Sequence, residues 1–507
     1  QNVRLAVFEL GDLDRLAAVW DMMDPRYARP LRLRILNEMA GFVETMARSL
    51  HAGDSLWVVS LMVDEESYQK GMWLSPILWF PKALSPGLNS SVNASAGRGF
   101  LASESTSGGG LLVSDSTRWP GIVANVDVAA TILAQLGVSR PVEMGGTPMR
   151  VAATAGRQAK VGQDIGDYWR ELAHIQWAHR LRPQVLRPYV ISQICLFLLA
   201  ALVWGLRFKR WYRPVRLLLS SMLFAPTILL IVSSPRLAAW HVFLFIWAGS
   251  LLLAWLTERV SIRFALLAAS VGVWLGVVVD LVRGGVWLKR SLLSYDPMLA
   301  ARFYGIGNEY MGIVIGAVIL TAALVWEWME QLRERGKGRW LRRILAQLIR
   351  WVVPLGMLLW ILVMASPADG ANAGGAVAAG VGFVSAWIFL RFPHMTPGRL
   401  VVGCLGGLAL ALFCLAVLNG LLAGDYESGG GVSHVGKALR SAGDGEWEML
   451  RAMAARKLQT NWRLIRHSIW TKVFAAALIV WFVVQFLPGK GRSMNRLHPA
   501  WTAAIRG

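Results

Sequence analysis

The sequence predicts a chain in two parts: an α/β domain over residues 1–155 and an all-α polytopic transmembrane bundle of about nine helices over residues 189–490. Two observations predict this. The 507 residues are 55% hydrophobic and only 16% charged, which is too apolar for a soluble chain of this length. Up to about residue 187, strand-like runs alternate with helical ones, whereas beyond it long apolar runs alternate with short basic loops. We therefore expect an integral membrane protein.

The first part shows the alternation of an α/β domain. Its expected elements, in chain order, are a strand at 4–10, an amphipathic helix at 31–50, a strand at 55–63, an apolar run at 73–80, a Gly/Ser-rich surface loop at about 86–110, and a helix within 121–137 that follows Asp127 and ends at Gly137. Strands that alternate with helices favour a parallel or mixed sheet covered on both faces.

The second part contains apolar runs long enough to cross about 30 Å of hydrocarbon. They lie near 189–206, 215–233, 237–256, 262–282, 308–326, 350–366, 373–390, 400–423 and 470–487. Residues 156–188 are expected to form a helical linker to the bundle, and residues 491–507 could begin a further segment. Glycines spaced four apart in three places favour close helix packing: Gly312 and Gly316, Gly370 and Gly374, and Gly403 and Gly407.

Basic residues set the expected orientation. If residue 189 begins outside, Lys and Arg concentrate in the loops that would face the cytoplasm, near 207–213, 259–263, 333–343, 391–399 and 490–496. We therefore expect a multi-pass protein of the cytoplasmic membrane with residues 1–188 extracytoplasmic. Export of that domain requires a signal peptide or an earlier helix, so the N-terminus is expected to be incomplete.

Charge and cysteine content exclude some classes of function. The net charge of +21 is explained by Lys and Arg at the ends of apolar segments, so nucleic acid is not an expected partner. The expected partners are membrane lipids and either an envelope polymer or another membrane protein. The three cysteines fall inside apolar runs, where they are small core residues and predict neither a disulfide framework nor a zinc site.

Polar residues gather at the outer end of the bundle in the segments around YDPMLAARFYGIGNEYMG and SPADGANAGG. Ionisable groups at membrane depth are costly and often mark a site, so an outward-facing polar cavity is one interpretation. The other is that they cap helices near headgroup level, with Asn308 as an N-cap and Glu309 as a first-turn acid. The candidate residues are Asp280, Asp296, Arg302, Tyr304, Asn308, Glu309, Asp369 and Asn372.

The long outside loop at 424–469 ends in an amphipathic pattern in which apolar residues recur at helical spacing among arginines and a lysine. This pattern predicts a basic helix on the outer membrane surface or over the mouth of the bundle. It could hold anionic headgroups or a polyanionic substrate, or serve only as an interfacial brace.

A family resemblance accompanies these patterns. The order of RLAVFELGD, a helix, GDSLWVVSLMVDEE, LSPILWF and SDSTRWPGIVANVDVAATILAQLG resembles the C-terminal half of an alkaline-phosphatase-superfamily domain over residues 3–150. The segment TRWPGIVANVDVAATILAQLGV at 117–138 carries it most specifically. RFYGIGNEYMG at 302–312 and NWRLIRHSIW at 461–470 further resemble an uncharacterised family of bacterial membrane proteins.

The superfamily resemblance implies a two-metal site, whose ligands are matched only in part. Asp12 stands where an Asp-x-x-x-His motif begins, but Leu16 takes the histidine position. Asp64 begins the counterpart of an Asp-His-Gly motif, with Glu65 in place of histidine, and Lys70 is near another expected histidine. Sites of this type depend on imidazole nitrogen, and an ammonium repels a metal. The remaining oxygens of Asp12, Asp64 and Glu65 suit at best a hard cation such as Mg²⁺.

Three functions are left as alternatives. The one favoured is a catalytically inactive phosphatase-like domain that serves binding, sensing or assembly in the bacterial cell envelope and has no cofactor. The second is a metal-dependent phospho- or sulfo-transferase or hydrolase acting on envelope lipids or polymers, with divalent metal as in the intact superfamily. The third is a lipid or polymer translocator whose pathway passes the polar outer residues.

Overall fold

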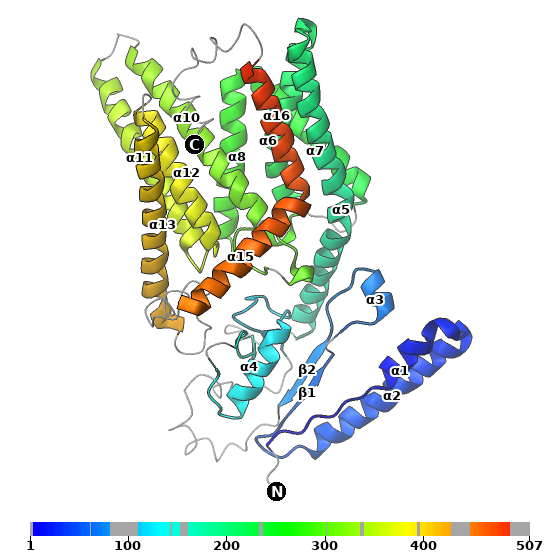
Figure 1. Ribbon diagram of the computed structural model, residues 1–507. Coiled ribbons are helices and arrows are strands. Elements are labelled where there is room, and N and C mark those ends of the chain that lie inside the picture. The colour runs from blue at the N-terminus through cyan, green and yellow to red at the C-terminus, as the bar shows by residue number, and fades with distance from the viewer. Residues whose placement is uncertain are drawn as a thin grey trace. The chain divides into compact units, whose positions relative to one another are not determined.

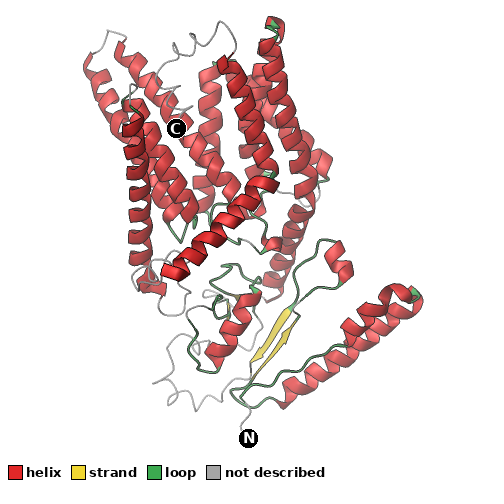
Figure 2. Ribbon diagram, viewed as in Figure 1, coloured by secondary structure: helices red, strands yellow, loops and turns green. Residues whose placement is uncertain are grey.

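Helices make up most of the structure, a computed structural model that describes residues 4–60, 62–81, 110–141, 144–152, 161–232, 237–300, 302–334, 339–392, 396–426 and 447–486 (Figures 1 and 2). The chain divides into two compact units. Unit 1 is Gln1–Leu172 with two short later segments, and unit 2 is the remainder. The division falls within helix α5 (Val161–Gly205), inside the linker that the sequence predicts.

Unit 1 consists of helices and two small sheets. Its elements are α1 (Asp12–Val19), the 3-10 turn η1 (Trp20–Met22), α2 (Pro25–Ser49), β1 (Ser55–Val59), α3 (Glu65–Gln69), β2 (Ile77–Pro81), β3 (Leu112–Val113), α4 (Asn125–Gln135) and β4 (Arg150–Val151). The expected helix at 31–50 is the larger part of α2, and the expected strand at 55–63 is β1, which ends four residues earlier. The Gly/Ser-rich stretch at 86–110 lies almost entirely outside the described residues.

The sheets of unit 1 differ from the parallel or mixed sheet that the sequence predicts. β1 pairs antiparallel with β2, with Trp57 opposite Trp79, and β3 pairs antiparallel with β4. Each sheet has two strands among the described residues. The α/β sheet of a phosphatase-like domain is thus not assembled in the part of the chain that the structure describes.

Residues 4–10 form no strand, contrary to the sequence prediction. The segment is an extended loop, and the side chains of Val7 and Phe8 are 83% and 57% exposed. Phe8 packs edge-on against Phe42 of α2, with ring centroids 5.8 Å apart. A strand needs a neighbour for its backbone N–H and C=O groups, and no described strand pairs with this segment. The prediction of a strand here was wrong because it relied on the apolar run alone.

Buried polar contacts hold α4 in unit 1. Asp127 is fully buried and is the third residue of the helix, not a residue preceding it as predicted. Its carboxylate accepts hydrogen bonds from the Ser114 and Ser116 hydroxyls at 2.7 and 2.6 Å, and from the amides of Ala124 and Thr147 at 2.9 and 2.8 Å. One side chain thereby joins the helix start to two separate loops.

The end of α4 matches the prediction at Gly137. This residue has φ +67°, the amide of Val138 donates to the carbonyl of Leu133 at 2.9 Å, and the amide of Gly137 donates to Ala134 at 3.2 Å. The pair of bonds is the Schellman ending that a left-handed glycine permits. Just inside this end, Gln135 Oε1 accepts from Ser55 Oγ at 3.1 Å and from Trp57 Nε1 at 3.0 Å, which joins α4 to β1.

Unit 2 is a helical bundle. Its elements are the rest of α5, η2 (Lys209–Trp211), α6 (Tyr212–Ile231), α7 (Ala239–Glu258), α8 (Ile262–Val282), α9 (Val286–Arg290), η3 (Pro297–Leu299, mostly assigned to unit 1), α10 (Asn308–Glu334), α11 (Arg339–Ala365), α12 (Ala373–Arg391), α13 (Pro397–Tyr426), α15 (Trp447–His467) and α16 (Ile469–Phe486). Among the described residues, eight helices are long and apolar enough to span a membrane, or up to nine if the bent pair α15 and α16 counts as one span.

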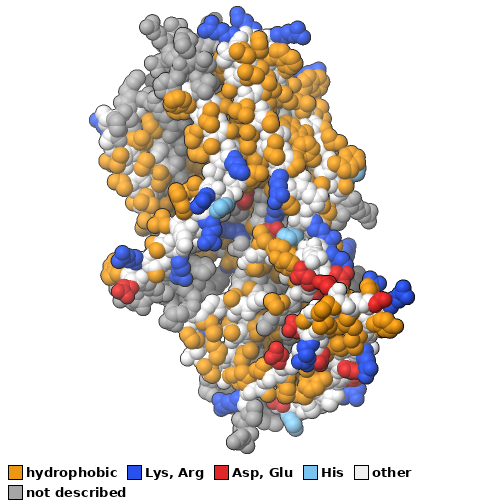
Figure 3. Space-filling view, turned by 45° about the vertical axis from the view of Figure 1, so that its right-hand side comes forward, with side chains coloured by type: hydrophobic (Ala, Val, Ile, Leu, Met, Phe, Trp, Pro, Cys, Tyr) orange, Lys and Arg blue, Asp and Glu red, His pale blue; other side chains and the backbone are white. Residues whose placement is uncertain are grey.

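These helices make the chain a multi-pass membrane protein, as the sequence predicts. Large apolar side chains cover much of the visible face of the bundle (Figure 3), and Leu198, Phe245 and Leu252 are each more than half exposed. Such exposure is expected where lipid replaces water. The predicted outer loop at 424–469 is described only in part: α13 runs to Tyr426, and α15 begins at Trp447.

The predicted glycine contacts form in one place and not in another. Between α12 and α13, a Cβ added at Gly407 would lie 2.4 Å from the carbonyl oxygen of Gly380, so the two backbones touch. Gly403 likewise packs beneath Ile388 of α12. At Gly312 and Gly316 of α10, an added Cβ would meet nothing within 4 Å, so that pair is not a packing face.

Polar side chains join α8 to α10 inside the bundle. Thr321 Oγ1 donates to Ser270 Oγ at 3.0 Å and accepts from Trp274 Nε1 at 3.2 Å. Towards the other end of α10, Arg263 Nη2 lies 2.8 Å from the carboxylate of Glu327, whose side chain is 3% exposed. Satisfied polar contacts of this kind fix the register of helices that apolar packing alone leaves loosely defined.

Candidate functional site

The candidate site lies in unit 2, where the loop between α8 and α10 folds against the ends of the helices. Residues 291–296 of this loop are buried although they form no helix. Backbone without regular structure needs partners for its polar groups, above all near a membrane. The partners come from side chains of the surrounding helices, among them several of the residues that the sequence analysis selected.

Asp280 anchors the start of the loop. This fully buried residue lies in the last turn of α8, and its two carboxylate oxygens accept the amides of Trp287 and Leu288, each at 2.7 Å. Its own carbonyl accepts from the amide of Gly285 at 2.7 Å. Asp280 is therefore bonded within the protein, and its role is to hold α9 against α8.

Arg182, which the sequence analysis did not select, holds the middle of the loop. Its guanidinium donates to the carbonyls of Leu292 and Tyr295, each at 2.9 Å, and to that of Ser291 at 3.3 Å. Its Nη1 lies 2.9 Å from the carboxylate of Asp296. The side chains of Arg182 and Asp296 are 17% and 7% exposed, so this is a buried ion pair with further hydrogen bonds.

His179 completes this group. Its Nδ1 lies 2.8 Å from the same Asp296 oxygen that Arg182 contacts. His179 and Arg182 stand three residues apart and therefore share one face of α5. Asp296 thus receives both side chains from a single helix. We refer to Arg182, His179 and Asp296 as the loop clamp.

Hydroxyl groups secure the loop from the opposite side. Ser291 Oγ donates to the carbonyl of Leu229 at 2.7 Å and lies 3.1 Å from the Tyr310 hydroxyl. That hydroxyl donates to the carbonyl of Pro226 at 3.0 Å. Pro226 and Leu229 belong to α6, and Tyr310 to α10, so the loop is bonded to both helices.

The loop between α11 and α12 is joined to the end of the first loop. The amide of Ile306 donates to the carbonyl of Gly370 at 2.8 Å. The carbonyl of Ile306 accepts from Arg302 Nη1 at 2.9 Å and from Asn372 Nδ2 at 3.0 Å, and Arg302 Nη1 also lies 3.3 Å from the carbonyl of Ala371. Asn372 additionally caps α12 by accepting the amide of Gly375.

Two selected residues at this junction have charges that the protein does not neutralise by direct pairing. Among the described residues, the contacts of Arg302 use one of its three guanidinium nitrogens and involve carbonyl oxygens only. Glu309 is half-buried in the first turn of α10 and interacts electrostatically with Arg182 and Arg302, and no described cation lies within salt-bridge distance of it. Burial lowers the pKa of Arg302, although the fields of Tyr295, Tyr304 and Glu309 oppose this.

The remaining selected residues lie at the edge. Tyr304 is half-buried, and Asn308 and Asp369 are exposed. Asn308 is the first residue of α10 and not its cap, because the carbonyl of Gly307 begins the helix by accepting the amide of Met311. Asp369 accepts from Ser366 Oγ at 2.8 Å in its own loop. Of the selected charged residues that are not exposed, Arg302 and Glu309 therefore have the fewest direct contacts among the described residues.

The three acids proposed as residual metal ligands lie in unit 1 and bond locally. Asp12 pairs with Arg15 at 2.7 Å, and Glu65 accepts from Gln69 at 2.9 Å. Asp64 caps α3 by accepting the amide and hydroxyl of Ser67 at 2.8 and 3.0 Å. Within the described residues, no group of three or more His, Cys, Asp or Glu side chains could hold a metal ion.

Compared with known proteins, the chain matches no family model, no curated protein and no solved structure. The function is therefore inferred from the arrangement of the chain's own residues.

The loop clamp was missed because its partners are far apart in sequence. A signal was present: residues 161–188 form a helical segment that enters the apolar run with both a histidine and an arginine on one face. A basic residue inside a membrane helix needs a partner of opposite charge, and the acids of the α8–α10 loop were available as partners.

Proposed function

We propose that this protein is a bacterial cell-envelope membrane protein whose bundle binds a phosphorylated headgroup, carried by an envelope lipid or polymer, at Arg302 and Glu309. In this proposal residues 1–188 are extracytoplasmic, and the phosphatase-like domain serves binding, sensing or assembly and not catalysis. The observation that carries the proposal is a contrast among the charged residues around the α8–α10 loop. The charged groups of Asp280, Asp296 and Arg182 are bonded within the protein. Arg302 uses one of its three guanidinium nitrogens among the described residues, and Glu309 has no described cation within salt-bridge distance.

The chemistry of the two groups indicates the ligand. Arg302 is held by carbonyl oxygens through Nη1, which leaves Nε and Nη2 for a bidentate contact with phosphate. Glu309 supplies an acceptor for a hydroxyl or ammonium of the same headgroup. A site that offers both an arginine and a carboxylate suits a ligand that has both an anionic phosphate and a donor group, such as a glycerophosphate or a phosphoethanolamine unit.

The local bonding of the acids in unit 1 supports a domain without metal catalysis. Asp64 would have to give up its bonds with Ser67 and its contact with Arg32 at 3.2 Å to bind a cation. The resemblance over 117–138 remains the basis for proposing a phosphatase-like ancestry. No observation favours the hydrolase, and a translocator would share the same binding site and differ only by a transport step after binding.

The proposal is tested by headgroup binding to the full chain in dodecyl maltoside. Phosphoethanolamine and glycerol phosphate, which have no acyl chains, are added at millimolar concentration, and the thermal midpoint is measured. We expect both probes to raise the midpoint of the wild type, Arg302→Gln to lose both effects, and Glu309→Gln to lose mainly the effect of phosphoethanolamine. Asp369→Asn, which removes an exposed acid of the neighbouring loop, is the matched control and keeps both.

Glu309→Gln also separates binding from folding. Because Glu309 has no direct cation partner among the described residues, its amide variant keeps the unliganded midpoint close to that of the wild type. A wild-type protein that neither probe stabilises would refute the proposal. So would a Glu309→Gln protein that binds both probes as the wild type does.

A further inference from the structure

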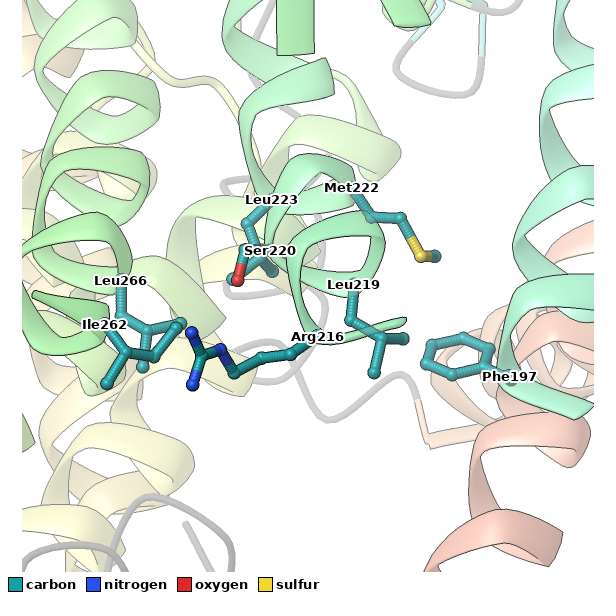
Figure 4. Close-up of a pocket in the computed structure, with 8 residues that line it drawn as sticks. All are labelled: Phe197, Arg216, Leu219, Ser220, Met222, Leu223, Ile262 and Leu266. Atoms are coloured by element: carbon teal, nitrogen blue, oxygen red, sulfur yellow. The ribbon is translucent and has the colours of Figure 1, made fainter. Parts of the chain in front are cut away.

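A second feature of unit 2, unrelated to the α8–α10 loop, is a groove of about 300 Å³ on the bundle, formed by α5, α6 and α8 (Figure 4). Its walls are mostly apolar and include Phe197, Leu219, Leu223 and Leu266. All three helices are long and apolar enough to span a membrane. A groove with apolar walls on such helices favours the hydrocarbon chains of the bilayer over water.

One charged residue lines this groove. Arg216, in the second turn of α6, extends towards Ile262 and Leu266 (Figure 4). Its Nε and Nη2 lie 3.3 and 3.1 Å from Glu258 Oε2, and Ser220 Oγ donates to Glu258 Oε1 at 2.6 Å. The side chain of Glu258 is 9% exposed and that of Arg216 is 52% exposed. The buried acid therefore fixes the orientation of the arginine, and Arg216 Nη1 has no hydrogen-bond partner among the described residues.

The chain next to this end of the groove has the features of a membrane interface. Phe208 and Trp211 are 51% and 52% exposed, and Lys209, Arg210 and Arg213 are exposed around them. Aromatic residues among basic ones mark the headgroup level of a bilayer, where the cations attract anionic lipids. Between Arg216 and Leu223, α6 advances about 10 Å, so the groove leads from headgroup level into the hydrocarbon.

From the groove, its single arginine and the adjoining basic segment, we propose that this site binds one anionic phospholipid of the surrounding bilayer, with an acyl chain along Leu219 and Leu223 and the phosphate at Arg216. The charge of the site selects the lipid class. The charge of Arg216 is balanced by that of Glu258, but Lys209, Arg210 and Arg213 add cations that have no ion-pair partner among the described residues. A zwitterionic lipid gains less from this surplus than an anionic one does.

Native mass spectrometry of the full chain in detergent tests this proposal with two lipids that share dioleoyl chains, phosphatidylglycerol and phosphatidylcholine. We expect the wild type to bind one phosphatidylglycerol about fivefold more tightly, since one interfacial cation contributes about 1 kcal/mol. Arg216→Gln paired with Glu258→Gln removes the ion pair at no change in net charge and leaves no buried acid unpaired. This double variant removes the group that contacts the phosphate, so it should weaken the binding of both lipids, whereas Arg210→Gln paired with Arg213→Gln removes surplus cations and should lose most of the preference.

Two further variants keep the result interpretable. Arg399→Gln removes an exposed arginine of α13 that does not line the groove, and it should leave the preference unchanged. Leu223→Trp fills the groove without touching the Arg216–Glu258 pair, and it should weaken both lipids about equally. Equal wild-type affinity for the two lipids would overturn the proposal, as would an Arg399→Gln loss of preference as large as that of the Arg210→Gln and Arg213→Gln pair. Neither outcome depends on Arg302 or Glu309, so the proposal stands or falls separately from headgroup binding there.

Discussion

The guanidinium of Arg182 lies 2.9 Å from the carboxylate of Asp296 and thereby joins the middle of α5 to the loop that follows α9. The same guanidinium satisfies three carbonyl oxygens of that loop. One side chain from a helix thus supplies donors that an irregular, buried segment cannot provide for itself. The arrangement explains how residues 291–296 remain ordered without secondary structure.

Removing Arg182 should therefore destabilise unit 2. In Arg182→Gln, Asp296 loses its ion pair with Arg182, and the carbonyls of Leu292 and Tyr295 lose their donor. We expect a loss of about 3–5 kcal/mol, as for other broken buried pairs. The free energy of unfolding, measured by titration with dodecyl sulfate in mixed micelles, checks this. Arg187→Gln, which removes an exposed arginine of the same helix α5, is the comparison, and an equal effect of the two would contradict the assignment.

Gly305 should tolerate no side chain. It has φ +78°, and a Cβ there would lie 2.3 Å from the carbonyl oxygen of Gly370, where the two loops join. Gly305→Ala combines a left-handed backbone with a steric overlap, so we expect a loss of about 2 kcal/mol or more. Gly312→Ala, in α10 with nothing within 4 Å, should be neutral or slightly stabilising. Thermal midpoints of the two variants in one detergent provide the measurement.

Asp127 should be the most sensitive acid of unit 1. Asp127→Asn keeps the shape but turns one acceptor into a donor, which faces either Thr147 N–H or Ala124 N–H. We expect a cost of about 1–3 kcal/mol, and more for Asp127→Ala. Resistance of residues 1–172 to limited proteolysis in the full chain, followed against urea, checks this. Asp115→Asn, which loses an exposed pair with Arg150, should cost less than about 1 kcal/mol.

The start of α3 should lose protection in acid. Partial burial raises the pKa of the Asp64 carboxyl, but the Ser67 amide and hydroxyl and the charge of Arg32 outweigh it, so the pKa lies below its usual range. A depressed folded-state pKa gives stability that is present above about pH 4 and is lost as the pH falls through the folded value. Hydrogen exchange of the amides of residues 65–71, corrected for the intrinsic rates, should therefore be faster at pH 3 than it is above about pH 4.

Two variants of α3 sharpen this test. Asp64→Asn should show the faster exchange at every pH, whereas Glu65→Gln, whose carboxylate bonds to Gln69 and does not cap the helix, should behave as the wild type. Exchange that slows on addition of Mg²⁺ in the wild type, but not in Asp64→Asn, would instead assign a metal to this carboxylate.

Membrane-spanning segments were predictable because their signal is local. A run such as 262–282 has enough apolar residues to cross the hydrocarbon, whatever its neighbours, and it is α8 with the same bounds. Strands cannot be predicted from a local apolar run in the same way. Residues 4–10 and 55–59 have similar apolar runs, but only the second has a described partner strand, and pairing is not encoded within either run.

The candidate site was predictable in part for the same reason. Acids and arginines between membrane segments are visible in the sequence, so Asp280, Asp296 and Arg302 were selected. The sequence did not reveal which of them are already bonded, because Asp296 meets its partners His179 and Arg182 from more than a hundred positions away. Only the folded structure distinguishes a charge that supports the loop from one that remains available.

The contact between Gly380 and Gly407 has a consequence for motion. There is no side chain between the two backbones at this contact, so α12 and α13 cannot slide past one another without a steric clash. The close contact also leaves little room for an alternative packing of the two helices. If the bundle changes shape when it binds a ligand, these two helices should travel as one rigid body. The bending would then fall on the seven-residue segment 366–372, where Asn372 and Gly370 meet the end of the α8–α10 loop.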